Sequence, residues 1–447
     1  MRDIKNIILN RKRKRSPFSH WRKKTSANSY RHLLEKKPAE KRLRFLLPVV
    51  ALLLASYPVV TSFFPAKTAI SSVKKYPPQS IKPLGPLDPL QSFQVSIDAF
   101  PAARVNGDLL TAPLPDGGAI VYGINQELQE RVKRVMETSQ VPYGAFVAVE
   151  PKTGRILALA GHSSIDPAWE HRGTFGLYPM ASLFKIVTAA AALEEKKVSA
   201  DTIFAYNGRL TSVNPKYWLV KPGRHNQEMS LTMAMGKSVN PVFGRLASDV
   251  AGKDSIMLCA ERFGFNQVLL PGTCVPPSRA EPPATENELK LMGAGLGREV
   301  KISPVHAALM MGAIANDGVM MMPSLAQEIK NGKGEVVYSI NPQAARRMVT
   351  PEIAGQLSKM LSSTVSSGTS RKVFHDRRGR LKLASINIAA KTGSIDGDDP
   401  AGHYSWFAAY APMNDPQIAI VALIVNEDKW KIKASYLGEQ ALEAFFH

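Results

Sequence analysis

Residues 144–159 read GAFVAVEPKTGRILAL and carry the clearest structural signal in this chain of 447 residues. Two apolar, strand-like runs, Gly144–Glu150 and Ile156–Gly161, are joined by Pro-Lys-Thr-Gly-Arg, which contains residues typical of turns. The pattern predicts a β-hairpin.

Further strands and helices are predicted on both sides of this hairpin. Three more strands are predicted near the C-terminus, at 386–392, 404–411 and 417–425, and their short connections favour antiparallel pairing. Helices are predicted at 126–138, 181–196, 240–251 and 433–446. This order indicates an α+β fold, in which an antiparallel sheet is closed from both chain ends and flanked by helices.

Positive charge is concentrated at the N-terminus. The chain has 57 Lys and Arg against 37 Asp and Glu, a net charge of +20. Residues 1–44 hold 16 of these bases and three of the acids, which leaves 41 bases and 34 acids for the rest. The high net charge therefore mostly describes this tail.

The next segment, residues 45–64, has no charged side chain and could cross a hydrocarbon core of about 30 Å. Basic residues before it favour cytoplasmic retention of the tail. We expect a basic cytoplasmic tail (1–44) and one uncleaved transmembrane helix (45–64) in a bacterial inner membrane, with the rest periplasmic or extracytoplasmic. The alternatives are a buried core helix and a cleavable signal, which is usually shorter. The basic run at 11–15 fits membrane retention better than nucleic-acid binding.

Residues 65–119 are interpreted as a proline-rich linker, since eight prolines fall between positions 76 and 115. Patterned structure begins near Ile120. We therefore predict one large domain at 120–447.

The two cysteines exclude a Cys-rich zinc module and a four-thiolate iron–sulfur site. Cys259 and Cys274 fall outside the predicted membrane span, where disulfides form. A bridge between them would close a 16-residue segment and contribute up to about 3 kcal/mol. The nine histidines show no metal-ligand spacing, so neither a metal nor a cofactor is expected.

One of three Ser-x-x-Lys motifs, Ser182 and Lys185, opens an apolar helix. The three-residue step keeps the two side chains neighbours on one helix face. The helix N-terminus favours a serine oxyanion, and apolar surroundings lower the pKa of a lysine, which makes its neutral form available as a base. The alternative is a helix capped by Ser182 with Lys185 on the surface.

Two further motifs follow. Ser238 of Ser238-Val-Asn240 falls at the junction of two predicted helices, where it could also be an N-cap. Lys391-Thr392-Gly393 ends a predicted strand, and a glycine there allows a ligand to approach the backbone closely. The other Lys-Thr-Gly, at 152–154, is interpreted as a hairpin turn.

In this order the motifs resemble those of the penicillin-binding protein transpeptidase family of serine acyl-transferases. The steps of 56 and 153 residues between their first residues suit that family. The similarity extends to the hairpin at 144–159, to 296–304 and 313–318, and to Gly402–Pro412. It covers about 328 residues, from Ile120 to the end of the sequence.

The resemblance implies a role for each motif residue. Ser182 would be the acylated nucleophile and Lys185 its general base. Ser238 would relay protons to the leaving amine, and Asn240 would orient Lys185 and the substrate amide.

The third motif would bind the donor substrate. Lys391, Thr392 and Gly393 would hold its terminal carboxylate and backbone. The backbone N–H groups of Ser182 and Ser394 would form the oxyanion hole.

The reaction implied is two-step acyl transfer. Ser182 would attack the D-Ala-D-Ala amide of a peptidoglycan stem peptide and release D-Ala, and an amine of a neighbouring stem would resolve the acyl-enzyme. β-Lactams would acylate the same serine. A glycan-polymerising partner is expected by analogy, since the stretch between 64 and 120 is too short for a glycosyltransferase domain.

Two other classes of function stay open. One is a hydrolase on the same fold: a DD-carboxypeptidase, an endopeptidase or a serine β-lactamase, for which Glu281, Glu286 and Glu288 are candidates to activate water. The other is a non-catalytic envelope scaffold or β-lactam sensor, although a pure binder has no need of an activated nucleophile.

Overall fold

The computed structural model describes residues 83–221, 223 and 226–447, which belong to one compact unit beginning at Ser80. The predicted basic tail, the transmembrane helix at 45–64 and the first part of the predicted linker lie outside the described residues. Among the helices that are described, none combines the length and apolar character needed to cross a membrane.

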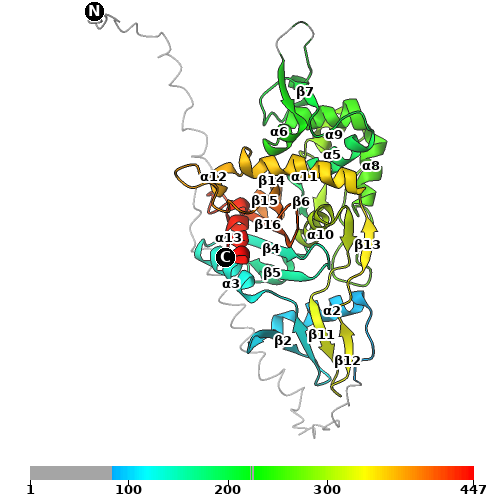
Figure 1. The fold of residues 1–447 in the computed structure, drawn as a ribbon, viewed down its shortest axis with the longest axis vertical. Helices are drawn as coiled ribbons and strands as arrows, with labels where there is room; N and C mark the ends of the chain where they lie inside the picture. The colour runs from blue at the N-terminus through cyan, green and yellow to red at the C-terminus, as the bar shows by residue number, and fades with distance from the viewer. Residues whose placement is uncertain (1–82, 222, 224–225) are drawn as a thin grey trace, which may run out of the picture. The chain divides into compact units, whose positions relative to one another are not determined.

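A five-stranded antiparallel sheet lies at the centre of the fold (Figure 1). Its order is β14-β15-β16-β4-β5, with bounds β4 Tyr143–Val149, β5 Ile156–His162, β14 Ala389–Asp398, β15 Ala401–Ala411 and β16 Ile418–Asn426. The hairpin of β4 and β5 forms where the sequence predicts it. Because β4 pairs with β16, the first and last of these strands along the chain meet inside the sheet, and the prediction of a sheet closed from both chain ends is confirmed.

The apolar run of β16 is buried at every position because helices cover both faces of the sheet. Successive residues point to opposite faces. Val421 and Leu423 join the hydrophobic cluster that contains α10 (Pro304–Ala315), and Ile420 and Ala422 join the one that contains α3 (Gln126–Thr138) and α13 (Ala434–Phe446). Figure 1 shows α13, coloured red, beside the sheet.

The middle of the chain forms the helical part. Its helices are α4 (Trp169–Arg172), α5 (Lys185–Glu194), α6 (Leu231–Gly236), α7 (Asn240–Arg245), α8 (Lys253–Arg262), α9 (Glu286–Gly293), α11 (Pro351–Ser366) and α12 (Arg371–Phe374). Nine of the ten residues of α5 are buried, which explains its apolar sequence. Two predicted helices are each divided: the 3-10 helix η2 (Ala181–Phe184) precedes α5, and a π-helix, η4 (Leu246–Ala251), follows α7.

The predicted linker is wrong for residues 83–119. This stretch contains α2 (Pro89–Ala99), the 3-10 helix η1 (Phe100–Ala102) and strands of a second five-stranded sheet. The order of that sheet is β1-β2-β3-β11-β12, with bounds β1 Arg104–Asn106, β2 Leu109–Pro113, β3 Ala119–Tyr122, β11 Ala326–Lys330 and β12 Val336–Ser339.

The prolines of this stretch stand where folded structure tolerates them. Pro89 is the first residue of α2, whose N-cap Asp88 forms a capping box with Gln91. A missing N–H costs nothing at that position. Pro101 lies in the first turn of η1, and Pro113 ends β2. The proline content that predicts a linker therefore marks the boundaries of folded elements.

Three small two-stranded sheets complete the fold. They pair β6 (Tyr178–Pro179) with β9 (Lys301–Ile302), β7 (Ile203–Tyr206) with β8 (Gln227–Ser230), and β10 (Val319–Met321) with β13 (Ala344–Arg347). Figure 1 shows the hairpin of β7 extending from the helical part.

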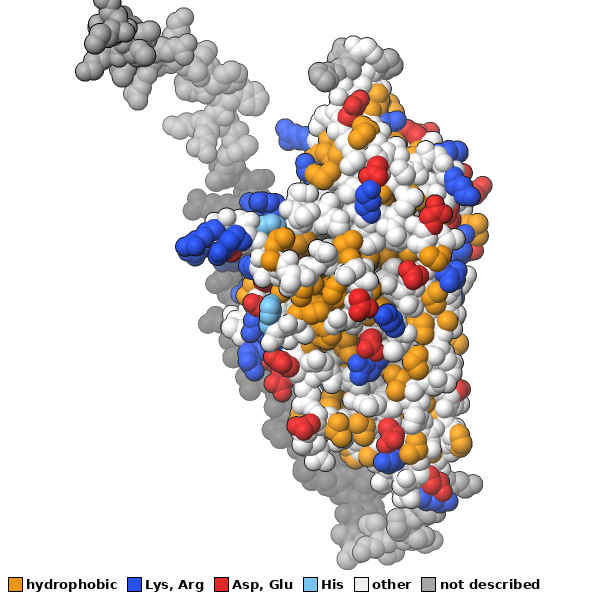
Figure 2. Space-filling view, viewed as in Figure 1, with side chains coloured by type: hydrophobic (Ala, Val, Ile, Leu, Met, Phe, Trp, Pro, Cys, Tyr) orange, Lys and Arg blue, Asp and Glu red, His pale blue; other side chains and the backbone are white. Residues whose placement is uncertain are grey.

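Exposed positive charge is also found on the folded part of the chain. Figure 2 shows Lys and Arg side chains gathered where α12 projects from the surface. Six exposed bases fall in and just after this helix: Arg371, Lys372, Arg377, Arg378, Arg380 and Lys382. The N-terminal tail therefore carries most of the net charge, and the folded part adds a smaller, local group of exposed bases.

Candidate active site

Ser182 lies in η2, at the entrance to the buried helix α5. The preceding residue, Ala181, has a φ of +53°, a conformation that costs a non-glycine residue energy. Gly295 packs directly against this turn. A Cβ on Gly295 would lie 2.4 Å from the Ala181 carbonyl oxygen and 2.7 Å from Ser182 Cα, so a larger residue does not fit there. The backbone around Ser182 is thus held in one strained position. Ser182 caps no helix, so the capping alternative does not apply.

Lys185 contacts Ser182 directly, with 2.7 Å between Nζ and Oγ. Lys185 is completely buried, so the alternative of a surface lysine is wrong. Its other partners are Oδ1 of Asn240 at 2.8 Å and the carbonyl oxygen of Ala294 at 2.6 Å. Burial, and then the positive charge of Lys391, lower the pKa of Lys185 well below its ordinary value. The lysine is therefore suited to act as a neutral base.

Ser238 occupies the junction between α6 and α7 with a φ of +55°. The N-cap of α7 is Val239, without a side-chain cap, so Ser238 is not used as an N-cap. Its Oγ instead receives a hydrogen bond of 2.9 Å from Nζ of Lys391. Lys391 also donates to the carbonyl oxygen of Thr392 at 2.7 Å, and burial lowers the pKa of Lys391 to about 7.

Strand β14 brings the third motif against the serine. A Cβ on Gly393 would lie 3.4 Å from the backbone nitrogen of Ser182 and 3.2 Å from Cβ of Trp406. A larger residue would push the strand away from η2. Ser394, the other proposed oxyanion donor, follows immediately and is exposed. The structure thus brings together Ser182, Lys185, Ser238, Asn240 and Lys391–Gly393.

Three contributors to the site lie outside the three motifs assigned to it. Thr369 lies within hydrogen-bonding distance of Thr392, with 2.6 Å between the two hydroxyl oxygens. Ala294 contributes only a carbonyl oxygen. Ser212 contributes a carbonyl oxygen 3.2 Å from Nδ2 of Asn240. A backbone oxygen can come from any residue type, so no motif could have identified the last two.

Two of the three glutamates that were candidates to activate water are engaged elsewhere. Glu286 forms an ion pair with Lys290, and Glu288 accepts a hydrogen bond from the backbone of Ala284. Both side chains, and that of Glu281, are exposed. No group of three or more metal-ligating side chains is found among the described residues.

The predicted disulfide is not formed, and both cysteines are free. Cys259 is buried on α8, where its sulfur faces the carbonyl oxygen of Val187 in α5. Cys274 is exposed, and its backbone nitrogen bonds to Gln94 of α2. The two cysteines therefore pack against different parts of the fold. Their short separation in sequence does not reveal this difference.

A serine that contacts a buried lysine, beside a second buried lysine on a sheet edge, is the arrangement expected of an enzyme that works through a serine acyl-enzyme. Residues 144–444 match the family model described as "Penicillin binding protein transpeptidase domain". The chain belongs to this family.

Relatives with known names share most of this domain. The chain is 28% identical over 355 residues to peptidoglycan D,D-transpeptidase PbpA of Mycolicibacterium smegmatis, which covers 71% of this chain and 69% of the relative. It is 25% identical over 344 residues to stage V sporulation protein D of Bacillus subtilis, covering 70% of this chain and 50% of that protein.

Solved structures of the same fold are similar to this one. The D,D-transpeptidase domain of a peptidoglycan glycosyltransferase from Eggerthella lenta matches with a TM-score of 0.61 and 27% identity, over 74% of this chain and 83% of that one. The penicillin G acyl-enzyme of penicillin-binding protein A from M. tuberculosis matches with a TM-score of 0.61 and 25% identity, over 74% and 82%.

Proposed function

We propose that this protein is a peptidoglycan D,D-transpeptidase that binds penicillin and works through an acyl-enzyme on Ser182. The observation that carries the assignment of the nucleophile is the contact of 2.7 Å between Ser182 Oγ and the buried Nζ of Lys185. A surface lysine would stay charged and could not take the proton.

Acylation begins with Lys185 in its neutral form. A neutral amine has two hydrogens and one lone pair. The oxygens of Asn240 and Ala294 accept the two hydrogens, so the lone pair faces Ser182 Oγ. As Oγ attacks the carbonyl carbon of the D-Ala-D-Ala amide, its proton passes to Lys185. The N–H groups of Ser182 and Ser394 stabilise the oxyanion, each by about 3 kcal/mol.

Expulsion of D-Ala requires a proton on the leaving nitrogen. The proton that Lys185 took from Ser182 reaches this nitrogen by way of Lys391 and Ser238, which are joined by a hydrogen bond, and the pKa of Lys391 is lowered by burial to about 7. Charged Lys391, with Thr392, also attracts the terminal carboxylate of the donor. An amine of a second stem peptide then attacks the acyl-enzyme. The new amide bond forms the crosslink, the ester bond to Ser182 breaks, and the proton lost by the amine passes through Lys185 to Ser182 Oγ.

The same chemistry explains penicillin binding. A β-lactam amide is opened by Ser182, but its leaving nitrogen stays attached to the acyl group. The product is a stable acyl-enzyme, as in the penicillin G complex of the relative from M. tuberculosis.

We further propose that residues 83–447 form the catalytic part and that 45–64 anchor it in the bacterial inner membrane, with residues 1–44 in the cytoplasm. The charge pattern supports this arrangement. The catalytic part would then meet peptidoglycan on the outer side, together with a partner that polymerises glycan.

Labelling of the full chain with a fluorescent penicillin tests the nucleophile. We expect long-lived label on the unaltered protein, no label on Ser182→Ala, and normal label on Ser72→Ala, which removes the serine of another Ser-x-x-Lys. Label that persists in Ser182→Ala would refute the assignment. Label lost within seconds would favour the carboxypeptidase, endopeptidase or lactamase alternative, in which water resolves the acyl-enzyme. A folded protein without label would favour the non-catalytic scaffold.

A further inference from the structure

A cavity of about 570 Å³ opens next to Asn240, in the segment that connects β7 to β8. Ser212 lines the cavity and accepts a hydrogen bond from Nδ2 of Asn240 at 3.2 Å. The backbone nitrogen of Asn240 bonds to the carbonyl oxygen of Leu210 in the same segment. The cavity wall and the side chain that holds Lys185 are therefore hydrogen-bonded neighbours.

The lining of this cavity is strongly positive. It includes Arg209, Lys216 and Lys221, and no Asp or Glu. All three cations are exposed, and none makes an ion pair with another described residue. Three uncompensated cations around one cavity attract an anionic group. We call these three side chains, with Ser212 and Tyr217, the cationic pocket.

The segment that carries the cationic pocket is anchored to α7. Trp218 is completely buried, and its Nε1 donates to Ser212 Oγ at 3.0 Å. Its ring packs so tightly on α7 that a Cβ on Gly244 would lie 2.2 Å from it. The pocket is therefore held in place by the helix that begins with Asn240.

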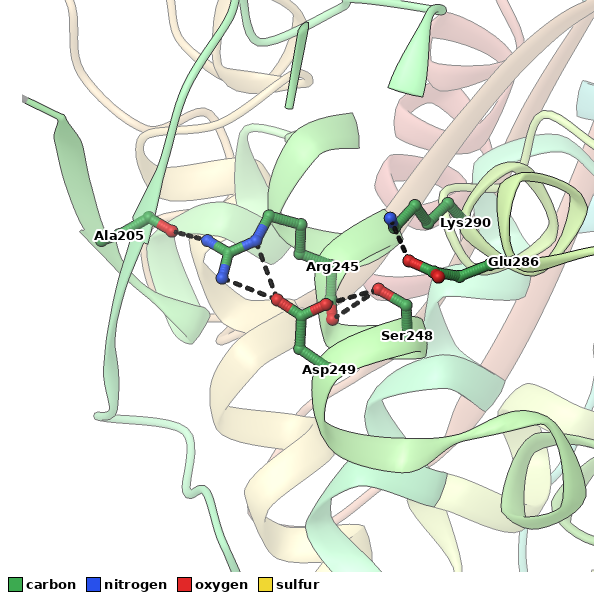
Figure 3. A network of polar contacts seen from close by, with 6 residues as sticks. All are labelled: Ala205, Arg245, Ser248, Asp249, Glu286 and Lys290. Atoms are coloured by element: carbon green, nitrogen blue, oxygen red, sulfur yellow. Dashed lines mark hydrogen bonds and ion pairs between the residues drawn. The ribbon is translucent and has the colours of Figure 1, made fainter. Parts of the chain in front are cut away.

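A polar network fixes the root of the same hairpin (Figure 3). Arg245 of α7 donates to the carbonyl oxygen of Ala205 in β7 at 2.6 Å. Two further bonds, of 2.9 and 2.6 Å, join Arg245 to Asp249. Asp249 thus forms an ion pair with Arg245 and balances its charge. The three cations of the cationic pocket have no such acidic partner among the described residues.

We propose that the cationic pocket binds a free carboxylate of the donor stem peptide, located before the D-Ala-D-Ala end. The inference rests on the proposed function. Lys391 and Thr392 are assigned to the terminal carboxylate, so the cationic pocket serves a second one. Asn240, which is assigned to the substrate amide, bonds to Ser212 of this pocket, so we place the chain that precedes that amide along the segment that carries the three cations. The pocket thereby distinguishes acidic stem peptides from amidated ones.

Two peptides that differ in one charge test the proposal. One is L-Ala-γ-D-Glu-L-Lys-D-Ala-D-Ala, and the other has the α-carboxylate of its glutamate replaced by a carboxamide. Each peptide competes with fluorescent penicillin for the full chain. We expect the carboxylate peptide to compete about 10-fold better, as one charge-assisted interaction provides. In the variant Arg209→Gln/Lys216→Gln/Lys221→Gln this preference should fall below about 3-fold.

A second triple variant controls for net charge. Lys253, Lys333 and Lys429 are exposed and lie outside the cavity, so Lys253→Gln/Lys333→Gln/Lys429→Gln should keep the full preference. The single variants Lys216→Gln and Lys221→Gln provide a further test that does not depend on the triple variant folding, because neither side chain makes a hydrogen bond to another described residue. Each should reduce the preference about 2-fold.

The outcomes separate this inference from the proposed function. Unaltered protein that takes up no penicillin label would overturn both. Protein that is labelled, but for which the two peptides compete equally, would overturn the cationic pocket alone. An undiminished preference in both single variants would do the same.

Discussion

Nζ of Lys391 lies 2.9 Å from Oγ of Ser238, which is 153 residues earlier in the chain. This contact joins the edge strand β14 to the junction of α6 and α7, and it sets a second buried lysine beside Lys185. Burial lowers the pKa of Lys185 most, and the positive charge of Lys391 lowers it further. The site therefore combines a neutral lysine, which can act as a base, with another that titrates near neutral pH.

Acylation by penicillin should have a bell-shaped dependence on pH. In the proposed mechanism Lys185 acts as the neutral amine, and its lowered pKa makes this form available at neutral pH. In the same proposal Lys391 attracts the carboxylate as the charged amine, whose population falls above a pKa of about 7. The acylation rate constant should therefore rise across the acid range and fall above neutral pH. Stopped-flow measurements between pH 5 and 10 check this, and a rate that climbs steadily to pH 10 would contradict it.

Lys185→Arg should remove the base without removing the positive charge. We expect acylation to slow by about 10³-fold at neutral pH, because the guanidinium group does not lose its proton. If Lys185→Arg is acylated as fast as the unaltered protein, a group other than Lys185 accepts the proton of Ser182.

Lys391→Met should make the protein more stable but inactive. Unfolded lysine has a pKa of 10.5, whereas burial lowers that of Lys391 to about 7, so between these values the unfolded chain binds more protons. The stability of the unaltered protein therefore rises with pH in this window, and burial of Lys391 costs most below it. We expect Lys391→Met to raise the free energy of unfolding by about 1–3 kcal/mol at pH 7, and by less near pH 10.

Urea unfolding at the two pH values measures this difference. Lys253→Met, at an exposed position, should change stability by less than about 0.5 kcal/mol and serves as the control. A Lys391→Met protein that is less stable at both pH values would mean that the two hydrogen bonds of Lys391 outweigh its burial.

Gly295→Ala should disable the site through the backbone. Gly295 has a φ of +69°, and a Cβ would meet the Ala181 carbonyl oxygen at 2.4 Å. We expect a loss of about 2–3 kcal/mol in stability and a fall of 100-fold or more in acylation. The control, Gly355→Ala in α11, has no atom within 4 Å and should stabilise the helix by about 1 kcal/mol. Normal labelling of Gly295→Ala would show that η2 can shift without harm.

The two cysteines should react as separate thiols. Cys274 is exposed, whereas burial raises the pKa of Cys259 to about 12. One equivalent of an alkylating reagent should therefore add to the native protein and a second only after unfolding, without prior reduction. Mass spectrometry counts the added groups. A protein that reacts only after reduction would restore the disulfide prediction.

Most of the central sheet could be predicted because its apolar strands each carry a signal in the sequence. β4, β5 and β16 are continuous apolar runs, and they are buried. β14 was predicted at 386–392 but runs from Ala389 to Asp398. Its second half is polar and partly exposed, and it is held by pairing with β15 as far as Ala401. Hydropathy does not detect a strand of this kind.

That the motif residues lie together could also be predicted, since chemistry restricts which residue types can serve as nucleophile and base. The residues that hold these side chains in place could not be predicted. Gly295 and the carbonyl oxygen of Ala294 act through backbone geometry. The second sheet was missed because it pairs β3 with β11, two strands about 200 residues apart, and because its prolines suggested a linker.

The pairing of β4 with β16 also means that the site can be completed only late in the synthesis of the chain. Val147 aligns with Val421, so the two halves of the central sheet come from chain segments made far apart in time. Such distant contacts make folding slow, because a long loop must close before they form. A nascent chain that has already extended past Ser182, Lys185 and Asn240 still lacks the strand that carries Lys391. We therefore expect that unfinished chains and C-terminally clipped fragments do not react with penicillin, although they contain Ser182 and Lys185.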